Sequence, residues 1–246
     1  MGRERFYQNW IDDLFVGVKL LCSGGSIKWE LGEKLSEKAR FVPELITGTG
    51  LPEADAQAVY HCKQIKGPSV GMDAIAKVRM QVPPEYPASL NPLVRRELAL
   101  RDPPCWTTDE LQTLRDLNQK GCKVTPKLLN VERSLQDWDH MPVPGGYMIF
   151  IVMEKVPGVP LVDFWDYDFP KREMIRAAFR SALIYHARPL DTHLGNVMYD
   201  EKENKCWFVD YEDVYVMEDK KPKVFSDNNY FLWGLARRPY GEEEKW

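Results

Sequence analysis

The residues of this chain whose types and spacing could do chemistry stand close together in one stretch. Asp191 and Asn196 are five positions apart, His193 and Gly195 lie between them, and Asp210 follows fourteen positions after Asn196. Carboxylate and amide oxygens are the ligands that hard divalent cations such as Mg²⁺ prefer in proteins. A fold that brought the two acids and the amide together would therefore hold such a cation.

The segment between Asn196 and Asp210 is typical of a β-hairpin. Residues 197–199 form a short apolar run, 200–205 a charged turn, and 206–209 a second apolar run. Two apolar runs separated by a polar turn predict antiparallel strands that lie side by side. We therefore expect Asn196 and Asp210 to meet at the open end of the hairpin, where the preceding acid also lies.

The composition is that of a folded globular protein. Of the 246 residues, 44% are hydrophobic and 28% are charged, so disorder is not expected, and the length suits one larger domain or two small lobes. The 33 basic and 37 acidic residues give a formal charge of −4, which speaks against a dedicated nucleic-acid binder, and no DNA partner is expected. The sequence carries no sign of an oligomeric state.

The cysteines and the apolar segments bear on the compartment. The five cysteines are scattered, odd in number and without C-x-x-C spacing, so a disulfide framework or a zinc site is not expected. The N-terminal region lacks the pattern of a signal peptide, and no apolar stretch is long enough to span a membrane. These features predict a cytoplasmic protein with no membrane partner.

Hydrophobic periodicity predicts the elements of the first half of the chain. Residues 3–22 carry apolar side chains at helical spacing and predict an amphipathic N-terminal helix. Three short strands are expected at 41–47, 57–65 and 74–82, and their close succession predicts an antiparallel meander.

Two helices are expected next, at 91–100 and 107–121. Thr107 and Glu110 stand at the spacing of a capping box, so they predict the start of the second helix. Its apolar positions recur every three residues, which predicts that one face packs against the protein.

The second half of the chain leads to the hairpin. After a polar loop at 131–144, the run 147–153 is uninterrupted apolar and predicts a strand buried on both faces. Residues 154–158 break the run and predict a hinge. An amphipathic helix is expected at 171–185, and a last short helix at 228–237.

This order of elements and motifs resembles the protein-kinase-like superfamily. The segment Asp191-Thr-His-Leu-Gly-Asn196 is similar to the D-x-H-x-G-N motif of aminoglycoside and choline phosphotransferases. The segment Val209-Asp-Tyr-Glu212 looks like the metal-binding D-F-E or D-F-G element, and residues 152–158 resemble the hinge. The resemblance covers roughly residues 41–215 and is closest to short fungal kinase-like proteins.

The resemblance implies a two-lobed α+β fold with a truncated C-terminal lobe. Residues 1–154 would form the N-lobe, with the N-terminal helix, the antiparallel sheet and a helix that bears a glutamate. Residues 155–246 would form a reduced C-lobe with the catalytic loop and the metal-binding hairpin.

The resemblance also implies roles for individual residues, with ATP and Mg²⁺ as cofactors. Asp191 would be the base that accepts a proton from the substrate, while Asn196 and Asp210 would hold Mg²⁺ between the nucleotide phosphates. Lys77, on the third strand, would contact the α- and β-phosphates, and Glu110 would orient it by an ion pair.

Further candidates belong to the same site. His193 lies in the catalytic loop, either as a catalytic residue or as one that ties the loop by hydrogen bonds. The hinge residue Glu154 and the turn residues Gly48 and Gly50 are cofactor-binding candidates, although Gly-Thr-Gly is a poor phosphate-cradling loop. Glu97 competes with the glutamate of the second helix as the partner of the strand lysine.

Two features depart from the family pattern. Pro189 stands two residues before the catalytic aspartate, where kinases and phosphotransferases usually carry histidine. Only 34 residues follow Glu212, which leaves no room for an activation segment. Phosphoryl transfer to a protein substrate is therefore disfavoured, and a small-molecule substrate is expected.

Three functions remain open. The first is ATP- and Mg²⁺-dependent phosphoryl transfer to a small-molecule hydroxyl or amine. The second is reuse of the scaffold for tRNA-dependent synthesis of arginine-containing cyclodipeptides in fungal natural-product biosynthesis. Asp191 would then act on an amine, and Arg95, Arg96 and Arg101 would meet tRNA phosphates. The third is a catalytically silent pseudokinase that binds a protein partner.

Overall fold

The computed structural model describes residues 9–42, 53–84, 87–183, 187–189, 191–211, 214–216 and 225–237. It combines helices with antiparallel sheets, so the fold class is α+β, as the sequence predicts. The chain divides into two compact units, residues 1–104 with 128–155 and residues 105–127 with 156–246. The boundary after Lys155 falls in the expected hinge segment. Residues 105–127 belong to the second unit, whereas the division expected from the sequence places them in the N-lobe.

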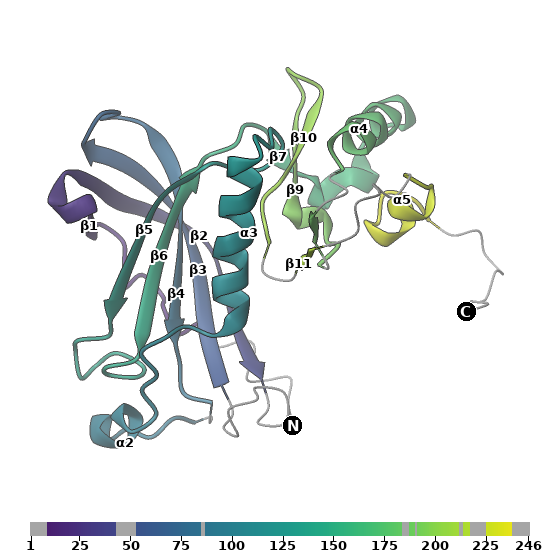
Figure 1. Ribbon diagram of the computed structural model, residues 1–246. Coiled ribbons are helices and arrows are strands. Elements are labelled where there is room, and N and C mark those ends of the chain that lie inside the picture. Colours follow the sequence, from purple (N-terminus) through teal and green to yellow (C-terminus); the bar gives the residue numbers. More distant parts are fainter. Residues whose placement is uncertain are drawn as a thin grey trace. The chain divides into compact units, whose positions relative to one another are not determined.

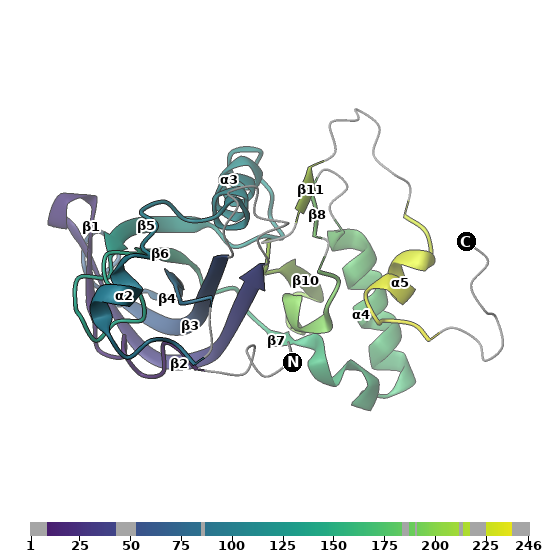
Figure 2. The same cartoon turned by 90° about the horizontal axis from the view of Figure 1, so that it is seen from below.

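The first unit is built on one antiparallel sheet of six strands in the order β1-β2-β3-β4-β6-β5 (Figure 1). Seen in Figure 2, the sheet curls strongly. The curl brings one edge toward the other, since Trp29 Nε1 in β2 donates a hydrogen bond of 2.7 Å to Asn130 Oδ1 in β5. The strands are β1 (Lys19–Cys22), β2 (Ile27–Val42), β3 (Glu53–Lys66), β4 (Asp73–Gln81), β5 (Leu128–Leu135) and β6 (Tyr147–Glu154).

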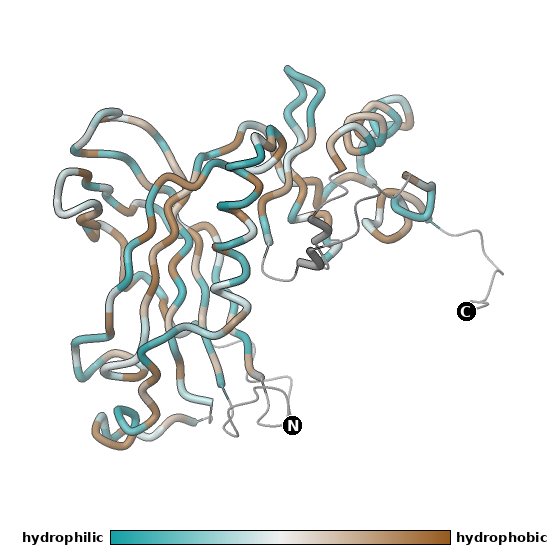
Figure 3. Tube along the Cα trace, in the orientation of Figure 1, coloured by the Kyte–Doolittle hydropathy of each residue, from teal (hydrophilic) through white to brown (hydrophobic). Residues whose placement is uncertain are grey.

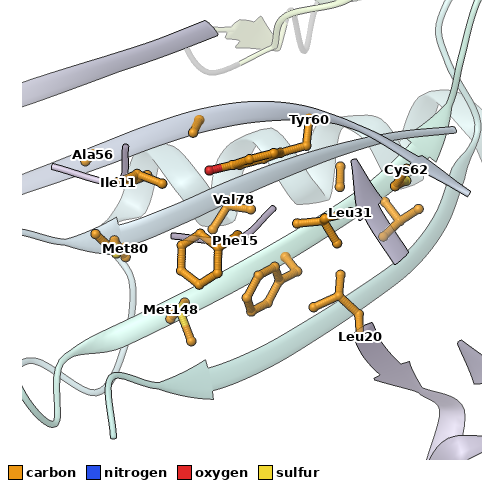
Figure 4. Close-up of a cluster of buried hydrophobic side chains, with 14 of the residues drawn as sticks. Ile11, Phe15, Leu20, Leu31, Ala56, Tyr60, Cys62, Val78, Met80 and Met148 are labelled. Atoms are coloured by element: carbon orange, nitrogen blue, oxygen red, sulfur yellow. The ribbon is translucent and has the colours of Figure 1, made fainter. Parts of the chain in front are cut away.

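One face of this sheet forms the main apolar core of the unit (Figure 4). Successive side chains of a strand point to opposite faces, so every second residue enters the core. Small residues predominate there, and they leave room for aromatic rings; Phe15 meets Phe150 edge to face at 5.4 Å. The core positions of β3 and β4 are Ala54, Ala56, Ala58, Tyr60, Cys62, Ala74, Ala76, Val78 and Met80.

The predicted N-terminal helix is wrong for the described residues of its range. Residues 11–17 form successive turns, with Asp12 and Gly17 at φ values of 46° and 78°, and β1 follows. Ile11 and Phe15 are buried in the sheet core, and the Glu37 carboxylate accepts hydrogen bonds from the backbone N–H groups of Ile11 and Asp12. Packing into the curved sheet therefore overrides the helical spacing.

Several predicted boundaries also change. The first long strand begins at Ile27 instead of at 41, because it pairs with β3 from Lys28 to Val42 in spite of its many charged residues. Residues 43–47 of the predicted strand lie outside the described residues. Strand β5 runs on to Leu135, where a loop was expected, since it pairs with β6 along its length. Helix α2 (Pro92–Arg96) is shorter than expected. The predicted strand at 57–65 and the doubly buried strand at 147–153 are confirmed.

The second unit combines helices with short ladders. Helix α3 (Cys105–Gln119) begins two residues before Thr107, which is therefore inside the helix, so the predicted capping box is wrong. Helix α4 (Phe169–Ala182) begins after Asp168, whose carboxylate accepts from the backbone N–H of Lys171. Helix α5 (Asn228–Leu232) is the short last helix that the sequence predicts.

The core of the second unit is an aromatic cluster beneath α4. Phe179 packs on Phe208 and Trp233 at 5.7 and 5.5 Å, and the latter two rings lie 5.2 Å apart. The hydropathy colouring of Figure 3 shows apolar and polar stretches alternating along α4, as expected for a helix with one buried face. None of the helices in the described ranges is both long and apolar enough to cross a bilayer.

Candidate functional site

The predicted hairpin is present and fixes the position of Asp210. Strands β9 (Val197–Asp200) and β10 (Lys205–Phe208) are antiparallel, with Phe208 opposite Val197. The ladder continues one step, because the backbone N–H of Val209 donates to the Asn196 carbonyl at 3.1 Å. Asp210 is the next residue along the chain, so the hairpin brings it to the Asn196 end, as the sequence predicts.

Asn196 also holds the preceding acid. Its side-chain Nδ2 donates to Asp191 Oδ2 at 3.1 Å and to the Asp191 carbonyl at 3.2 Å. Within the described part of the chain, neither Asn196 Oδ1 nor Asp191 Oδ1 takes part in a hydrogen bond. The amide therefore orders the Asp191 loop through its nitrogen and keeps its oxygen for another partner.

A second two-stranded ladder adjoins the Asp191 and Asp210 segments in the sequence. Strands β8 (Ala187–Pro189) and β11 (Val214–Val216) are antiparallel, with Pro189 opposite Val214. Asp191 follows this pair by two residues, and Asp210 precedes it by four. Both acids therefore stand on short connections between two ladders. Proline is tolerated in β8 because a two-stranded ladder consists of edge strands only.

His193 is the capping residue of a short turn in this loop. The 3₁₀ turn η4 (Leu194–Asn196) begins after His193, whose Nδ1 accepts from the backbone N–H of Gly195 at 2.9 Å. A Cβ added at Gly195 would lie 2.9 Å from the same Nδ1, so the cap requires glycine there. The imidazole thus ties the loop by a hydrogen bond, which is the structural alternative considered for this residue.

Tyr211, the residue after Asp210, is packed in the core of the second unit. It is buried, and burial raises the pKa of its phenol well above the usual range, with Cys122 and Asp210 acting in the same direction. Its hydroxyl is buried without a hydrogen-bond partner in the part of the chain that the structure describes. The ring therefore serves packing and fixes the backbone at Asp210.

The oxygen set fits Mg²⁺ with a nucleotide better than a metal held by protein alone. Asp191 is exposed, while Asn196 and Asp210 are half-buried. No group of three or more histidine, cysteine, aspartate or glutamate side chains that could hold a metal occurs among the described residues. Mg²⁺ is commonly held by one or two carboxylates, with water and substrate phosphates completing its coordination.

The nucleotide-binding candidates lie in both units. Lys77 is only 4% exposed and stands in β4 opposite Val59 and Ile151, so the prediction that it lies on the third strand of the meander is confirmed. Glu110 lies on α3 in the second unit and is 3% exposed, and its pairing with Lys77 stays a prediction. Glu154 is the last residue of β6, opposite Ala74.

Two further candidates cannot be placed. Gly48 and Gly50 lie outside the described residues, so their role as phosphate-binding turn glycines stays a prediction.

The sequence analysis missed a buried ion pair on the face of β4 that carries Lys77. Arg79 contacts Asp55 Oδ2 through Nε at 2.9 Å and through Nη2 at 2.8 Å, and both side chains are 1% exposed. Polar residues that alternate with the core residues give the signal: Asp55 and Gln57 in β3, then Lys77, Arg79 and Gln81 in β4. That period of two predicts a polar buried face.

The arginines proposed to meet tRNA phosphates are largely engaged within the first unit. Arg95 donates to the backbone carbonyls of Ser89, Leu90, Asp139, Met141 and Pro142. Arg96 Nη2 pairs with Asp139 Oδ1 at 2.7 Å. Arg95 and Arg96 thus have partners within the first unit, and the tRNA partner stays a prediction.

Comparison with known proteins finds likeness among solved structures. No family model matches the sequence, and no curated protein does. A solved structure, that of the Cydia pomonella granulovirus kinase PK-1, aligns with a TM-score of 0.40 and 16% identity over 77% of this chain and 53% of that one. The chain spans about half the length of that kinase. At this TM-score the likeness carries no argument about the reaction.

Proposed function

We propose that the protein is a transferase that moves a phosphoryl group from a Mg²⁺-bound nucleotide, with ATP the expected donor, to a hydroxyl or amine of a small molecule. The observation that carries the proposal is the pair of hydrogen bonds from Asn196 Nδ2 to Asp191, made where the hairpin delivers Asp210. An ordered base beside two metal ligands is the arrangement that phosphoryl transfer needs.

Asp191 acts as the base in this proposal. One carboxylate oxygen is held by Asn196 Nδ2, which orients the group, and the exposed carboxylate keeps its other oxygen for the proton of the acceptor. Asn196 Oδ1 and the Asp210 carboxylate would hold Mg²⁺, which when bound neutralises charge on the nucleotide phosphates.

Lys77 supplies a positive charge toward the nucleotide in the same proposal. This role follows from the resemblance to the kinase-like superfamily, in which a strand lysine contacts the nucleotide phosphates. Glu110 is the proposed orienting partner of this lysine, by resemblance to the kinase-like superfamily. Pro189, which replaces the usual histidine, is accommodated by β8, and His193 orders the loop through its cap.

Calorimetry of ATP binding with and without Mg²⁺ tests the metal site. The wild type should bind Mg–ATP, and Asp210→Asn should lose the Mg²⁺-dependent part of the affinity. Asp227→Asn is the matched control, because Asp227 is an exposed aspartate of the same unit and its side chain makes no capping hydrogen bond. A wild type that binds no nucleotide would favour the pseudokinase alternative and refute the proposal.

Nucleotide turnover tests the base. Asp191→Asn should keep Mg–ATP affinity and lower the rate of nucleotide consumption by about 10²-fold or more, the usual loss when a general base is removed. An unchanged rate would show that Asp191 is not the base.

A further inference from the structure

Two arginine side chains lie over one indole ring in the second unit. Arg172 of α4 has its Cζ 5.2 Å from the centroid of the Trp165 ring, and Arg237 has its Cζ 4.2 Å from it. Trp165, in the 3₁₀ turn η3 (Leu161–Asp166), is itself fixed, because its Nε1 donates to the Gly234 carbonyl at 3.0 Å. Three segments therefore meet at this ring: η3, α4 and the segment after α5.

The two guanidinium groups lack an acidic partner at contact distance in the described parts of the chain. Neither Arg172 nor Arg237 makes an ion pair there, and Arg172 Nε is buried without a hydrogen-bond partner. Arg176, one turn along α4, differs, because it pairs with Glu173 and donates to the Leu235 carbonyl. Stacking on an indole stabilises a guanidinium, but two like charges at one ring repel each other.

The cluster lies beside the proposed catalytic loop within the same unit. A Cβ added at Gly234, whose carbonyl holds the indole, would lie 3.6 Å from Leu194 Cδ1. A Cβ added at Gly195 would lie 3.6 Å from Val162 Cγ1, which belongs to η3 as Trp165 does. Residues on both sides of the indole thus contact the turn between His193 and Asn196.

We propose that the acceptor substrate carries an anionic group, a phosphate or a carboxylate, which Arg172 and Arg237 bind beside the indole of Trp165. This inference rests on the proposed transferase function. Guanidinium groups recognise phosphate and carboxylate oxygens through paired N–H donors, and the anion supplies the acidic partner at contact distance. The acceptor is thus a small anionic molecule whose hydroxyl or amine reaches Asp191 while its anionic end is held by the arginines.

This assignment differs from what the resembled phosphotransferases suggest. Aminoglycosides and choline are cations, and a pair of arginines without an acidic partner at contact distance repels a cationic acceptor. The reaction would be the same, but the acceptor class would be the opposite in charge.

Titration calorimetry with inorganic phosphate and, separately, with acetate at low ionic strength tests the site without requiring turnover. The wild type should bind one anion. Arg172→Gln and Arg237→Gln should each weaken binding about tenfold or more, the effect of losing one charge-assisted hydrogen bond. Tighter binding of phosphate would identify a phosphorylated acceptor, and tighter binding of acetate a carboxylate.

Arg180→Gln is the matched control. Arg180 lies on the same helix with its Cζ 5.2 Å from the Phe225 ring, and it also makes no ion pair within the described ranges. It should leave anion affinity unchanged. Should Arg172→Gln fail to fold, the exposed Arg237 carries the test.

The outcomes separate this inference from the transferase proposal. No anion binding by the wild type, or equal losses in Arg180→Gln and Arg237→Gln, would overturn the anion site. Mg–ATP affinity, measured on the same variants, should not change in Arg237→Gln. If phosphate binds at Arg237 while the wild type binds no Mg–ATP, the anion site is confirmed, but the proposal that it holds the acceptor of a transferase is refuted.

Discussion

Gly158→Ala should damage the sheet that supports the catalytic loop. Strand β7 (Val159–Pro160) pairs with β9, with Val159 opposite Tyr199, in a three-stranded sheet of order β10-β9-β7. Gly158 precedes β7 at φ 99° and lies against the backbone of β9. An added Cβ would stand 2.2 Å from the Tyr199 carbonyl oxygen and 2.7 Å from Asp200 N.

The magnitude follows from two separate costs. A non-glycine residue at positive φ costs roughly 1–2 kcal/mol. The clash adds about 1–3 kcal/mol for forced displacement of packed groups, and the neighbouring atoms are backbone that cannot rotate away. We therefore expect Gly158→Ala to lower the free energy of unfolding by about 2–5 kcal/mol, a large part of the roughly 5–15 kcal/mol of a typical domain.

Urea unfolding followed by circular dichroism measures the loss, and Gly121→Ala separates the two costs. Gly121 lies in the same unit at φ 71°, but a Cβ added there meets no atom within 4 Å. It should therefore show only the conformational cost of about 1–2 kcal/mol. If Gly158→Ala were no more destabilising than Gly121→Ala, the close approach of Gly158 to β9 would be refuted.

Three further predictions concern the buried ion pair, the capping histidine and the core thiol. Arg79→Met should lower the free energy of unfolding by about 3–5 kcal/mol because it removes the arginine that pairs with the buried Asp55 carboxylate. The double variant with Asp55→Leu should recover most of the loss, and no recovery would contradict the pairing. His193→Asn should keep nucleotide turnover, since an asparagine side chain can also accept the capping hydrogen bond, whereas His193→Ala should lower turnover. Equal losses of turnover in the two variants would show that His193 transfers a proton instead. Burial, with Asp73 second, raises the pKa of the Cys62 thiol to about 12 from 9.0. The folded state thus favours the neutral thiol. The stability that this thiol contributes is complete below pH 9 and is lost as the pH rises toward 12. The free energy of unfolding, measured over this pH range, should therefore fall less steeply in Cys62→Ala than in the wild type.

The sequence by itself determined the hairpin and the loop from Asp191 to Asn196 that precedes it. Asn196 and Asp210 are joined by a local ladder whose register follows from two apolar runs and one polar turn, so nearby residues suffice to place them. The doubly buried β6 was predictable for a similar reason, because an uninterrupted apolar run of this length is typical of a strand buried on both faces.

The tertiary structure alone decided the N-terminal segment and the cluster of Arg172 and Arg237 at Trp165. Ile11 and Phe15 adopt turns because a curved sheet with alanines on its inner face offers them a place, and the sheet comes later in the chain. Trp165 and Arg237 are 72 positions apart, and no local pattern brings them together. Local periodicity predicts elements that pair with segments close in sequence. Residues that pack against an element far away in the chain adopt the conformation that this packing stabilises, and local periodicity does not predict it.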